Sequence, residues 1–420
     1  MIGHIAVPGD KSISHRAVLI GSLSEGETRV HGFGRSGDTE ATVRAMRALA
    51  VEIEDVSDDE LIVHGVGLRG LRPPGEPIDC GNAGTLMRLL TGILAGQSGS
   101  FELTGDESLR SRPMDRVAEP LARMGAQIET ANGLPPLVVE GSDELRAIDY
   151  SLPVASAQVK SAILLAALNA EGRTTVVEPA ATRDHTELML AAAGARVRRR
   201  PSSVSIEPAG SLELGEVTVP GDFSAAAPFI VAATLLAGSE LTIHDLGLNP
   251  LRTGLIDVLE RMGARVAVFN RRKLGGEWIG DLEVRAAELV STEITAAEVP
   301  RLVDELPLFA LAAAFARGES RVRGAGELRV KETDRIETVA NGLRTLGVRV
   351  RASDDGFGVR GVPSRPKGGG MGSAGDHRIA MLAAVAGLVS REGVDVGDAE
   401  AAAISFPGFF DLVEAVAQRG

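Results

Sequence analysis

Six segments of the chain share one pattern of hydrophobic positions: a helix-length run of Ala, Leu, Ile and Val, then a glycine, then a short run typical of a β-strand. A glycine at a helix end adopts the left-handed conformation that lets the chain turn into a strand. The six glycines, at steps of 73, 73, 66, 80 and 75 residues, are Gly26, Gly99, Gly172, Gly238, Gly318 and Gly393. The pattern predicts six copies of one structural unit.

A second pattern recurs out of phase with the first. Segments such as LARMGAQIE and LERMGARVAV place a small residue between a helix and a strand. Their small residues, at steps of 75, 69, 69, 84 and 73, are Ala50, Gly125, Gly194, Gly263, Gly347 and Gly420. Each unit is therefore predicted to run strand, helix, strand, helix, strand, strand.

The first helix of each unit is apolar on nearly every face, which indicates burial on several sides. We expect an α/β protein with two domains of three units each, in which parallel helices lie inside and sheets lie outside. This arrangement is an inside-out α/β barrel. The repeats leave an ordinary doubly wound α/β protein as the alternative fold.

Composition narrows the possible functions. The 420 residues include 44 Lys and Arg against 57 Asp and Glu, a formal net charge of −13, so the surface as a whole repels nucleic acid and anionic membranes. Aromatic residues make up 3% of the chain, too few for base-stacking platforms. The single cysteine, Cys80, excludes an internal disulfide. Because the first residues show no targeting pattern, we expect a cytoplasmic protein.

Polar and charged residues precede the predicted helices. If equivalent units pack in parallel, these helix starts converge on one face, where free N–H groups and helix dipoles favour anions. A cation at a helix start costs roughly 0.3–1 kcal/mol unless an anion binds there. Seven cations occupy such positions: Lys11, Arg16, Arg112, Arg183, Lys331, Arg335 and Arg378. They predict a ligand with more than one anionic group.

Helix capping is the alternative explanation for the acidic and hydroxyl residues at these starts. An N-cap side chain accepts a hydrogen bond from a free backbone N–H and contributes about 1 kcal/mol. Capping does not explain the cations. The candidate caps are Asp10, Ser12, Asp79, Ser156, Asp222, Asp304 and Asp376.

Two glycine-rich segments and three histidines were weighed separately. Residues 32–37 match the G-x-G-x-x-G of dinucleotide sites, but Asp38 occupies the helix start where a pyrophosphate would lie. Residues 367–370, KGGG, lack the spacing of a phosphate loop and are predicted to be a mobile segment. Local hydrogen bonding, rather than metal binding, is expected for His15, His185 and His377.

Nine segments together resemble the 5-enolpyruvylshikimate-3-phosphate (EPSP) synthases. In chain order they are PGDKSISHRAV, DCGNAGTLMR, LRSRPM, SAQVKSA, TRDHTE, NPLRTG, VDELP, LRVKETDR and GDHRIAM. The resemblance spans essentially the whole chain. It implies two domains of three βαβαββ units, one of residues 10–221 and one of residues 1–9 with 222–420, joined by chain crossings near Asp10 and Asp222.

The resemblance also implies an activity: transfer of the enolpyruvyl group of phosphoenolpyruvate to the 5-hydroxyl of shikimate 3-phosphate, with release of phosphate. It implies no metal or organic cofactor, small-molecule partners only, and a monomer. The residues implied for shikimate 3-phosphate are Lys11, Ser12, Arg16, Ser156, Ala157, Gln158, Arg183, Asp304 and Lys331. Those implied for phosphoenolpyruvate are Lys11, Asn82, Gly84, Thr85, Arg112, Gln158, Glu332, Arg335 and Arg378.

Addition followed by elimination needs a base for the attacking hydroxyl and a proton donor to C3 of phosphoenolpyruvate. By resemblance and position, Asp304 accepts the hydroxyl proton, Glu332 exchanges the proton at C3, and Lys11 stabilises charge on the leaving phosphate. Which group moves which proton at each step stays open. Ser405-Phe-Pro replaces a Lys that some members carry there, and places the chain nearer the SFP subgroup.

Two other functions were weighed. The sister transferase acting on UDP-N-acetylglucosamine uses a Lys-Asn pair and usually a loop cysteine, whereas this chain has Lys11-Ser12 and a Cys80 at a helix start. A non-catalytic repeat ring around DNA is disfavoured by the charge of −13. Glyphosate inhibits the family at the phosphoenolpyruvate site, and we expect this chain to be sensitive, with Gly84 bordering that site.

Overall fold

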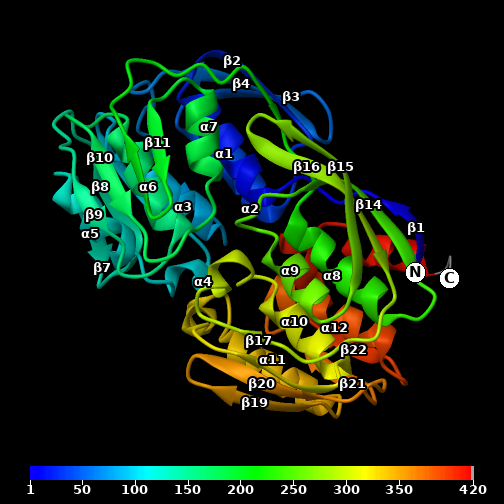
Figure 1. Cartoon of the computed structure of the whole chain (residues 1–420). Coiled ribbons are helices and arrows are strands. Elements are labelled where there is room, and N and C mark those ends of the chain that lie inside the picture. The colour runs from blue at the N-terminus through cyan, green and yellow to red at the C-terminus, as the bar shows by residue number, and fades with distance from the viewer. Residues whose placement is uncertain (418–420) are drawn as a thin grey trace. The chain divides into compact units, whose positions relative to one another are not determined.

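The structure, a computed structural model, describes residues 1–417, so Gly420, the last repeat position, lies outside it. The described chain divides into two compact units (Figure 1). Unit 1 contains Met1–Pro8, Pro220–Lys273 and the chain from Trp278 onward. Unit 2 contains Gly9–Val219 together with Leu274–Glu277.

Unit 2 holds three four-stranded sheets, each from one copy of the repeat. In each sheet the first strand pairs in parallel with the second. The strands, in sheet order, are β13 (Glu216–Thr218), β2 (Glu25–His31), β4 (Glu60–Val66) and β3 (Glu52–Asp55); β5 (Ile78–Asp79), β6 (Ser100–Thr104), β8 (Leu134–Glu140) and β7 (Gln127–Ala131); β9 (Asp149–Ser151), β10 (Thr174–Val177), β12 (Ser203–Ile206) and β11 (Val197–Arg200).

Unit 1 repeats the plan, and its third sheet has two strands. The strands are β1 (Ile2–Ile5), β14 (Glu240–Gly247), β16 (Glu277–Arg285) and β15 (Arg265–Leu274); β17 (Glu293–Ile294), β18 (Gly318–Val322), β20 (Gly356–Gly361) and β19 (Arg349–Ser353); β21 (Gly369–Gly372) and β22 (Val394–Gly397). The first strand of the chain, β1, pairs with β14, and β13 completes the sheet of β2. These two strands are exchanged relative to the order of the repeats.

The helices alternate with the strands as the repeats predict, with an additional short helix in the second copy. Those of unit 2 are α1 (Lys11–Ser22), α2 (Gly37–Ala48), α3 (Gly84–Leu94), α4 (Glu107–Arg110), α5 (Asp115–Arg123), α6 (Ala157–Ala167) and α7 (His185–Ala192). Those of unit 1 are α8 (Phe223–Leu235), α9 (Gly254–Arg261), η1 (Val299–Arg301), α10 (Leu306–Phe315), η2 (Gly326–Val330), α11 (Arg335–Thr345), α12 (His377–Val389), η3 (Ala399–Ile404) and α13 (Phe409–Ala417).

The apolar first helices form the interior, as predicted. Helices α1, α3 and α6 pack together in unit 2, and α8, α10 and α12 pack together in unit 1. Nearly every residue of α8 and α10 is buried. Each unit has its own hydrophobic core, so the inside-out α/β fold predicted from the repeats is confirmed.

The two glycine-rich segments have structural explanations. A Cβ on Gly9 would lie 1.9 Å from the carbonyl oxygen of Gly32, and one on Gly34 would lie 2.1 Å from that of Gly9. The first two glycines of the G-x-G-x-x-G match are therefore needed where two backbone segments touch. The KGGG segment was predicted as a mobile loop, which is wrong for its end: Gly369 and Gly370 lie in β21, paired with β22.

Close packing of α3 on α6 generates a test of the core. A Cβ on Gly92 of α3 would lie 2.2 Å from the carbonyl oxygen of Ala162 on α6. Gly92→Ala should therefore lower the free energy of unfolding by about 1–3 kcal/mol, the usual cost of overpacking, as measured by urea denaturation. The control is Gly75→Ala, because nothing lies within 4 Å of a Cβ there. Equal stability of the two variants would contradict the packing described.

Candidate active site

Arg16 connects three helices at one end of unit 2. This α1 residue is 3% exposed; its Nε donates to Thr186 Oγ1 at 2.6 Å and its Nη2 to Ser161 Oγ at 3.0 Å. Burial lowers the pKa of Arg16 to about 10, although the carboxylate of Glu187 opposes the shift. Because hydroxyl groups rather than carboxylates hold the guanidinium, its charge is suited to an anionic ligand.

Gln158 links the starts of α6 and α3. Its Nε2 donates to Thr85 Oγ1 at 3.0 Å, and its Oε1 accepts from Arg88 Nη1 at 2.9 Å. The sequence predicted Gln158 and Thr85 as site residues, and the structure brings them together. It did not assign Arg88, which lies four residues after Gly84 and so on the same helix face.

Gly84, the first residue of α3, lies beside two guanidinium groups. A Cβ there would be 2.8 Å from Arg88 Nη1 and 3.4 Å from Arg112 Nη1. Arg112 is 8% exposed and donates through Nη2 to Asn82 Oδ1 at 2.6 Å. The predicted set Asn82, Gly84 and Arg112 is therefore one cluster, whose glycine leaves room beneath two cations.

Lys11, the first residue of α1, forms an ion pair with Asp38 at the start of α2, Nζ to Oδ2 2.7 Å. The side chains are 20% and 11% exposed. Ser156 and Ala157 lie at the start of α6, and Arg183 precedes α7, so each occupies the helix start expected for it.

Capping explains four of the seven candidate caps. Asp10, Ser156, Asp222 and Asp376 each accept a hydrogen bond from a backbone N–H in the first turn of a helix. Capping is wrong for the other three. Ser12 lies inside α1, Asp79 lies in β5, and Asp304 precedes α10, whose N-cap position is Glu305 without a side-chain hydrogen bond.

Asp304 faces three arginines within unit 1. Its Oδ2 lies 3.5 Å from Arg252 Nη1 and 3.5 Å from Arg378 Nη2, and its Oδ1 lies 3.6 Å from Arg335 Nη1. The Asp304 side chain is 11% exposed. Since it caps no helix, a carboxylate placed among three cations is a candidate for proton transfer rather than a structural cap.

Arg335, 1% exposed, is held between two acidic groups at the start of α11. Its Nη2 donates to Glu332 Oε2 at 2.5 Å, and its Nε donates to Asp376 Oδ2 at 2.8 Å. Burial disfavours its charge, but Glu332 and Asp376 outweigh burial and raise the pKa of Arg335 above its usual range. The structure thus joins the predicted residues Glu332 and Arg335. It does not join Lys331, whose ion-pair partner among residues 1–417 is Glu327 at 3.6 Å.

Glu305 was not predicted as a site residue. It is 1% exposed, accepts a hydrogen bond from Ser224 Oγ, and lies 3.8 Å from Arg252 Nη1 and 3.9 Å from Arg378 Nη1. Burial raises the pKa of this carboxyl, Arg252 opposes the rise, and the charge of Asp304 adds to it. The signal in the sequence was the adjacent pair of acidic residues before an apolar helix, which only one capping role could not explain.

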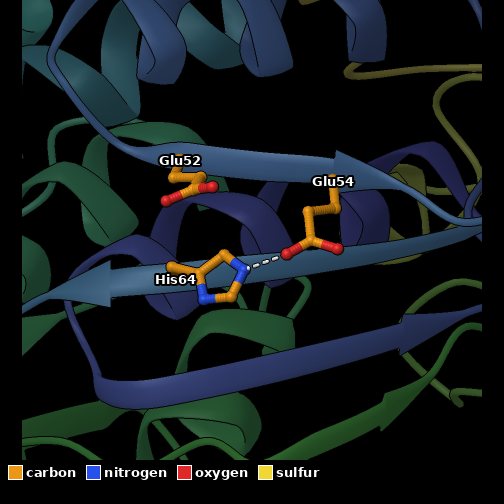
Figure 2. Close-up of side chains that lie close together, drawn as sticks. All are labelled: Glu52, Glu54 and His64. Atoms are coloured by element: carbon orange, nitrogen blue, oxygen red, sulfur yellow. Dashed lines mark hydrogen bonds and ion pairs between the residues drawn. The ribbon is translucent and has the colours of Figure 1, made fainter.

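One group of side chains in residues 1–417 has the composition of a metal site. Glu52, Glu54 and His64 bring three ligand atoms within 4.8 Å of one another on the sheet of β3 and β4 (Figure 2). His64 Nε2 already hydrogen-bonds Glu54 Oε1 at 2.6 Å, and its Nδ1 lies 3.7 Å from Glu27. Both glutamates are exposed. A cross-strand ion pair accounts for the group, so it is not assigned to a metal.

The fold is that of the enolpyruvyl transferases. The crystal structure of the enolpyruvyl transferase NikO from Streptomyces tendae matches it with a TM-score of 0.77 over 99% of this chain and 94% of that chain, at 21% identity, a likeness of fold alone. EPSP synthase from Acinetobacter baumannii matches with a TM-score of 0.88 over 99% and 95% of the chains, at 43% identity.

The sequence model of the EPSP synthase (3-phosphoshikimate 1-carboxyvinyltransferase) family matches residues 1–413, and the chain belongs to that family. A 3-phosphoshikimate 1-carboxyvinyltransferase from Alkalilimnicola ehrlichii is 52% identical over 411 residues, which cover 98% of this chain and 92% of the relative. The family resemblance predicted from the nine segments is confirmed.

His15, at the start of α1, generates a prediction on pH. It is fully buried, its Nδ1 hydrogen-bonds Thr42 Oγ1 at 2.6 Å as expected, and burial lowers its pKa from 6.5 to about 3, with Asp38 opposing and Lys11 and Arg16 adding to the shift. Between these two values the unfolded chain binds one more proton than the folded chain. Stability should therefore fall as the pH falls from 6.5 towards 3.

The expected slope is about 1.4 kcal/mol per pH unit beyond that of a His15→Gln variant, measured by urea denaturation from pH 7.5 to 4.5. NMR of the ring should show no protonation at pH 5. The assignment fails if wild type and variant have parallel profiles.

Proposed function

We propose that this chain transfers the enolpyruvyl group of phosphoenolpyruvate to the 5-hydroxyl of shikimate 3-phosphate and releases phosphate. The observation that carries the proposal is the family match over residues 1–413. Clustered cations at the helix starts support it, because the two substrates together bring a carboxylate and two phosphates, and Arg binds such oxygens in pairs.

The residues proposed for shikimate 3-phosphate are mostly those around Arg16. That guanidinium has uncharged partners from α6 and α7, which leaves its charge for a phosphate. The full proposed set is Lys11, Ser12, Arg16, Ser156, Ala157, Gln158, Arg183, Asp304 and Lys331. Lys331 stands on resemblance alone, since its own contact is with Glu327.

The residues proposed for phosphoenolpyruvate come from two clusters. The first is the group around Gly84 in unit 2: Asn82, Gly84, Thr85, Arg112 and Gln158. To these we add Lys11 and, from unit 1, Glu332, Arg335 and Arg378. Arg88 joins the proposal, since it touches Gln158 and lies over Gly84.

Proton transfer is assigned to Asp304 and Glu332. Asp304 accepts the proton of the attacking hydroxyl, and three guanidinium groups hold it in position for this step. Glu332, fixed by Arg335, exchanges the proton at C3 of phosphoenolpyruvate. Lys11 stabilises the negative charge on the departing phosphate.

Three further statements belong to the proposal. The two compact units are proposed to be functional domains of residues 10–221 and of residues 1–9 with 222–420. We propose a monomer in the cytoplasm. None of the helices in residues 1–417 is both long and apolar enough to cross a membrane.

A phosphate-release assay tests the activity. With phosphoenolpyruvate present, the protein should release phosphate when shikimate 3-phosphate is added and not when UDP-N-acetylglucosamine is added, with or without a chelator. Release with the sugar nucleotide instead would assign the chain to the sister reaction. Loss of activity with chelator would reject the proposal that no metal takes part.

The carboxylates are tested by Asp304→Asn and Glu332→Gln. Each should lower kcat by roughly 10²–10⁴, the usual contribution of a positioned acid or base, while thermal unfolding changes little. The control is Asp10→Asn, because Asn caps a helix as well as Asp does and this side chain caps α1. A lowered melting temperature with kcat preserved would return both carboxylates to a structural role.

Gly84→Ala tests the phosphoenolpyruvate cluster. The new methyl group would press on Arg88 Nη1, 2.8 Å away, and occupy space beneath Arg112. Glyphosate is longer than the substrate, so its inhibition constant should rise by a larger factor than KM for phosphoenolpyruvate. Inhibition series on wild type and variant decide this. Equal inhibition constants, or a wild type indifferent to glyphosate, would place Gly84 away from the site.

A further inference from the structure

The outer face of one sheet in unit 1 carries a dense group of arginines. Across β18, β20 and β19, Glu319 pairs with Arg360 and Arg360 with Arg349, while Arg321 pairs with Gly358 and Gly358 with Arg351. These residues are on the solvent side, because the alternate residues Val322, Val350, Phe357 and Val359 are buried in the core. We call this surface the arginine face; β19 and β20 are seen at its sheet in Figure 1.

The arginine face is hollowed. A cavity of about 770 Å³ opens over it, a size typical of small-molecule sites. Six arginines and one acidic residue, Glu319, line it; the arginines are Arg321, Arg323, Arg344, Arg349, Arg351 and Arg360. The hollow exists because Gly358, in the middle of the central strand, has no side chain. A Cβ there would have only ordinary contacts, 3.6 Å to Glu319 Oε1 and 3.9 Å to Arg321 Cγ.

Internal ion pairs neutralise only part of this charge. Arg321 lies 3.2 Å from Glu319, and Arg323 lies 2.9 Å from Glu293. Arg349 and Arg360 are directly opposite each other on neighbouring strands, an arrangement of like charges that destabilises a sheet. Within residues 1–417, Arg349, Arg351 and Arg360 have no acidic partner within ion-pair distance.

Ordinary roles of surface charge do not explain the arrangement. Charges on an edge strand prevent pairing with other chains, which accounts for Arg349 and Arg351 on β19 but not for Arg360 on the central β20. The corresponding face of the β2, β4 and β3 sheet shows the contrast. There His64 lies between acidic residues and Arg29 pairs with Glu60 at 2.7 Å (Figure 2).

We propose that the arginine face binds a compact polyanion of the polyphosphate class. Arg forks bind phosphate oxygens in pairs, and the hollow over Gly358 places several of them around one small ligand. A nucleic-acid strand fits less well: the chain's net charge of −13 repels it, and no aromatic side chain lines the solvent side, since Phe357 is buried.

This site is distinct from the proposed substrate site. Arg344 enters the hollow from the last turn of α11, whereas Arg335 begins the same helix. Nine residues at 1.5 Å each separate them by about 13 Å along the axis. The arginine face is therefore at the end of α11 opposite to the substrate residues, and the proposal does not depend on the activity.

Isothermal titration with inorganic tripolyphosphate tests the proposal on the full chain, with shikimate 3-phosphate present throughout. Wild type should bind one tripolyphosphate at this site. Gly358→Val fills the hollow without changing charge, and a β-branched residue suits a strand. We expect this variant and Arg351→Glu/Arg360→Glu each to weaken binding at least tenfold, with phosphate release from phosphoenolpyruvate unchanged.

The matched control is Arg198→Glu/Arg200→Glu on exposed β11, which changes the net charge equally and should alter binding less than twofold. An equal loss in this control would show general electrostatic attraction and overturn the proposal. So would unchanged binding in Gly358→Val. Tighter binding of a single-stranded oligonucleotide than of tripolyphosphate, lost in the same variants, would replace the compact anion with nucleic acid.

Discussion

The structure depends on one constraint: the central helices are surrounded by protein, so only their ends can meet solvent or ligand. Helices such as α8 and α10 bury nearly every residue, and glycine at position 92 lets α3 and α6 approach to backbone contact. Polar chemistry is thereby confined to the helix termini and the loops before them. Each candidate site residue assigned to these units lies at such a position or within two turns of it.

Confinement to helix starts creates an electrostatic conflict that the fold resolves with acidic residues. A cation at an N-terminus opposes the helix dipole. Lys11 is balanced by Asp38, and Arg335 by Glu332 and Asp376. Arg16 is held instead by hydroxyl groups. The charge that remains is fixed in direction by buried hydrogen bonds, so it can meet an anionic substrate without reorganisation.

The outer faces of the sheets are free of this constraint, and they have diverged. Copies with the same strand order carry an acidic group around His64 in one case and the arginine face in another. Because the solvent side of a sheet contributes little to the core, its residues can change without loss of the fold. A ligand site there is compatible with the repeat, whereas a cation inside a central helix is not.

The sequence by itself determined the six units, the buried helices, the family, and most of the cations at helix starts. These are local properties: the periodicity of apolar residues, the glycine at a helix end, and short motifs depend on neighbours in the chain. Four N-caps were among the candidates for the same reason. It could not separate Asp304, which faces three arginines, from Asp10, which caps a helix, because both simply precede an apolar run.

Tertiary structure decided which residues meet. Arg16 reaches Thr186, 170 positions later, and Arg88 reaches Gln158 through helix packing that no local pattern encodes. Glycines 369 and 370 became a strand because β22 supplies the parallel partner. Strand register brought Arg360 opposite Arg349, which are 11 residues apart in the chain. Such pairings follow from long-range packing and register, so the chemistry they create becomes visible only once the chain has folded.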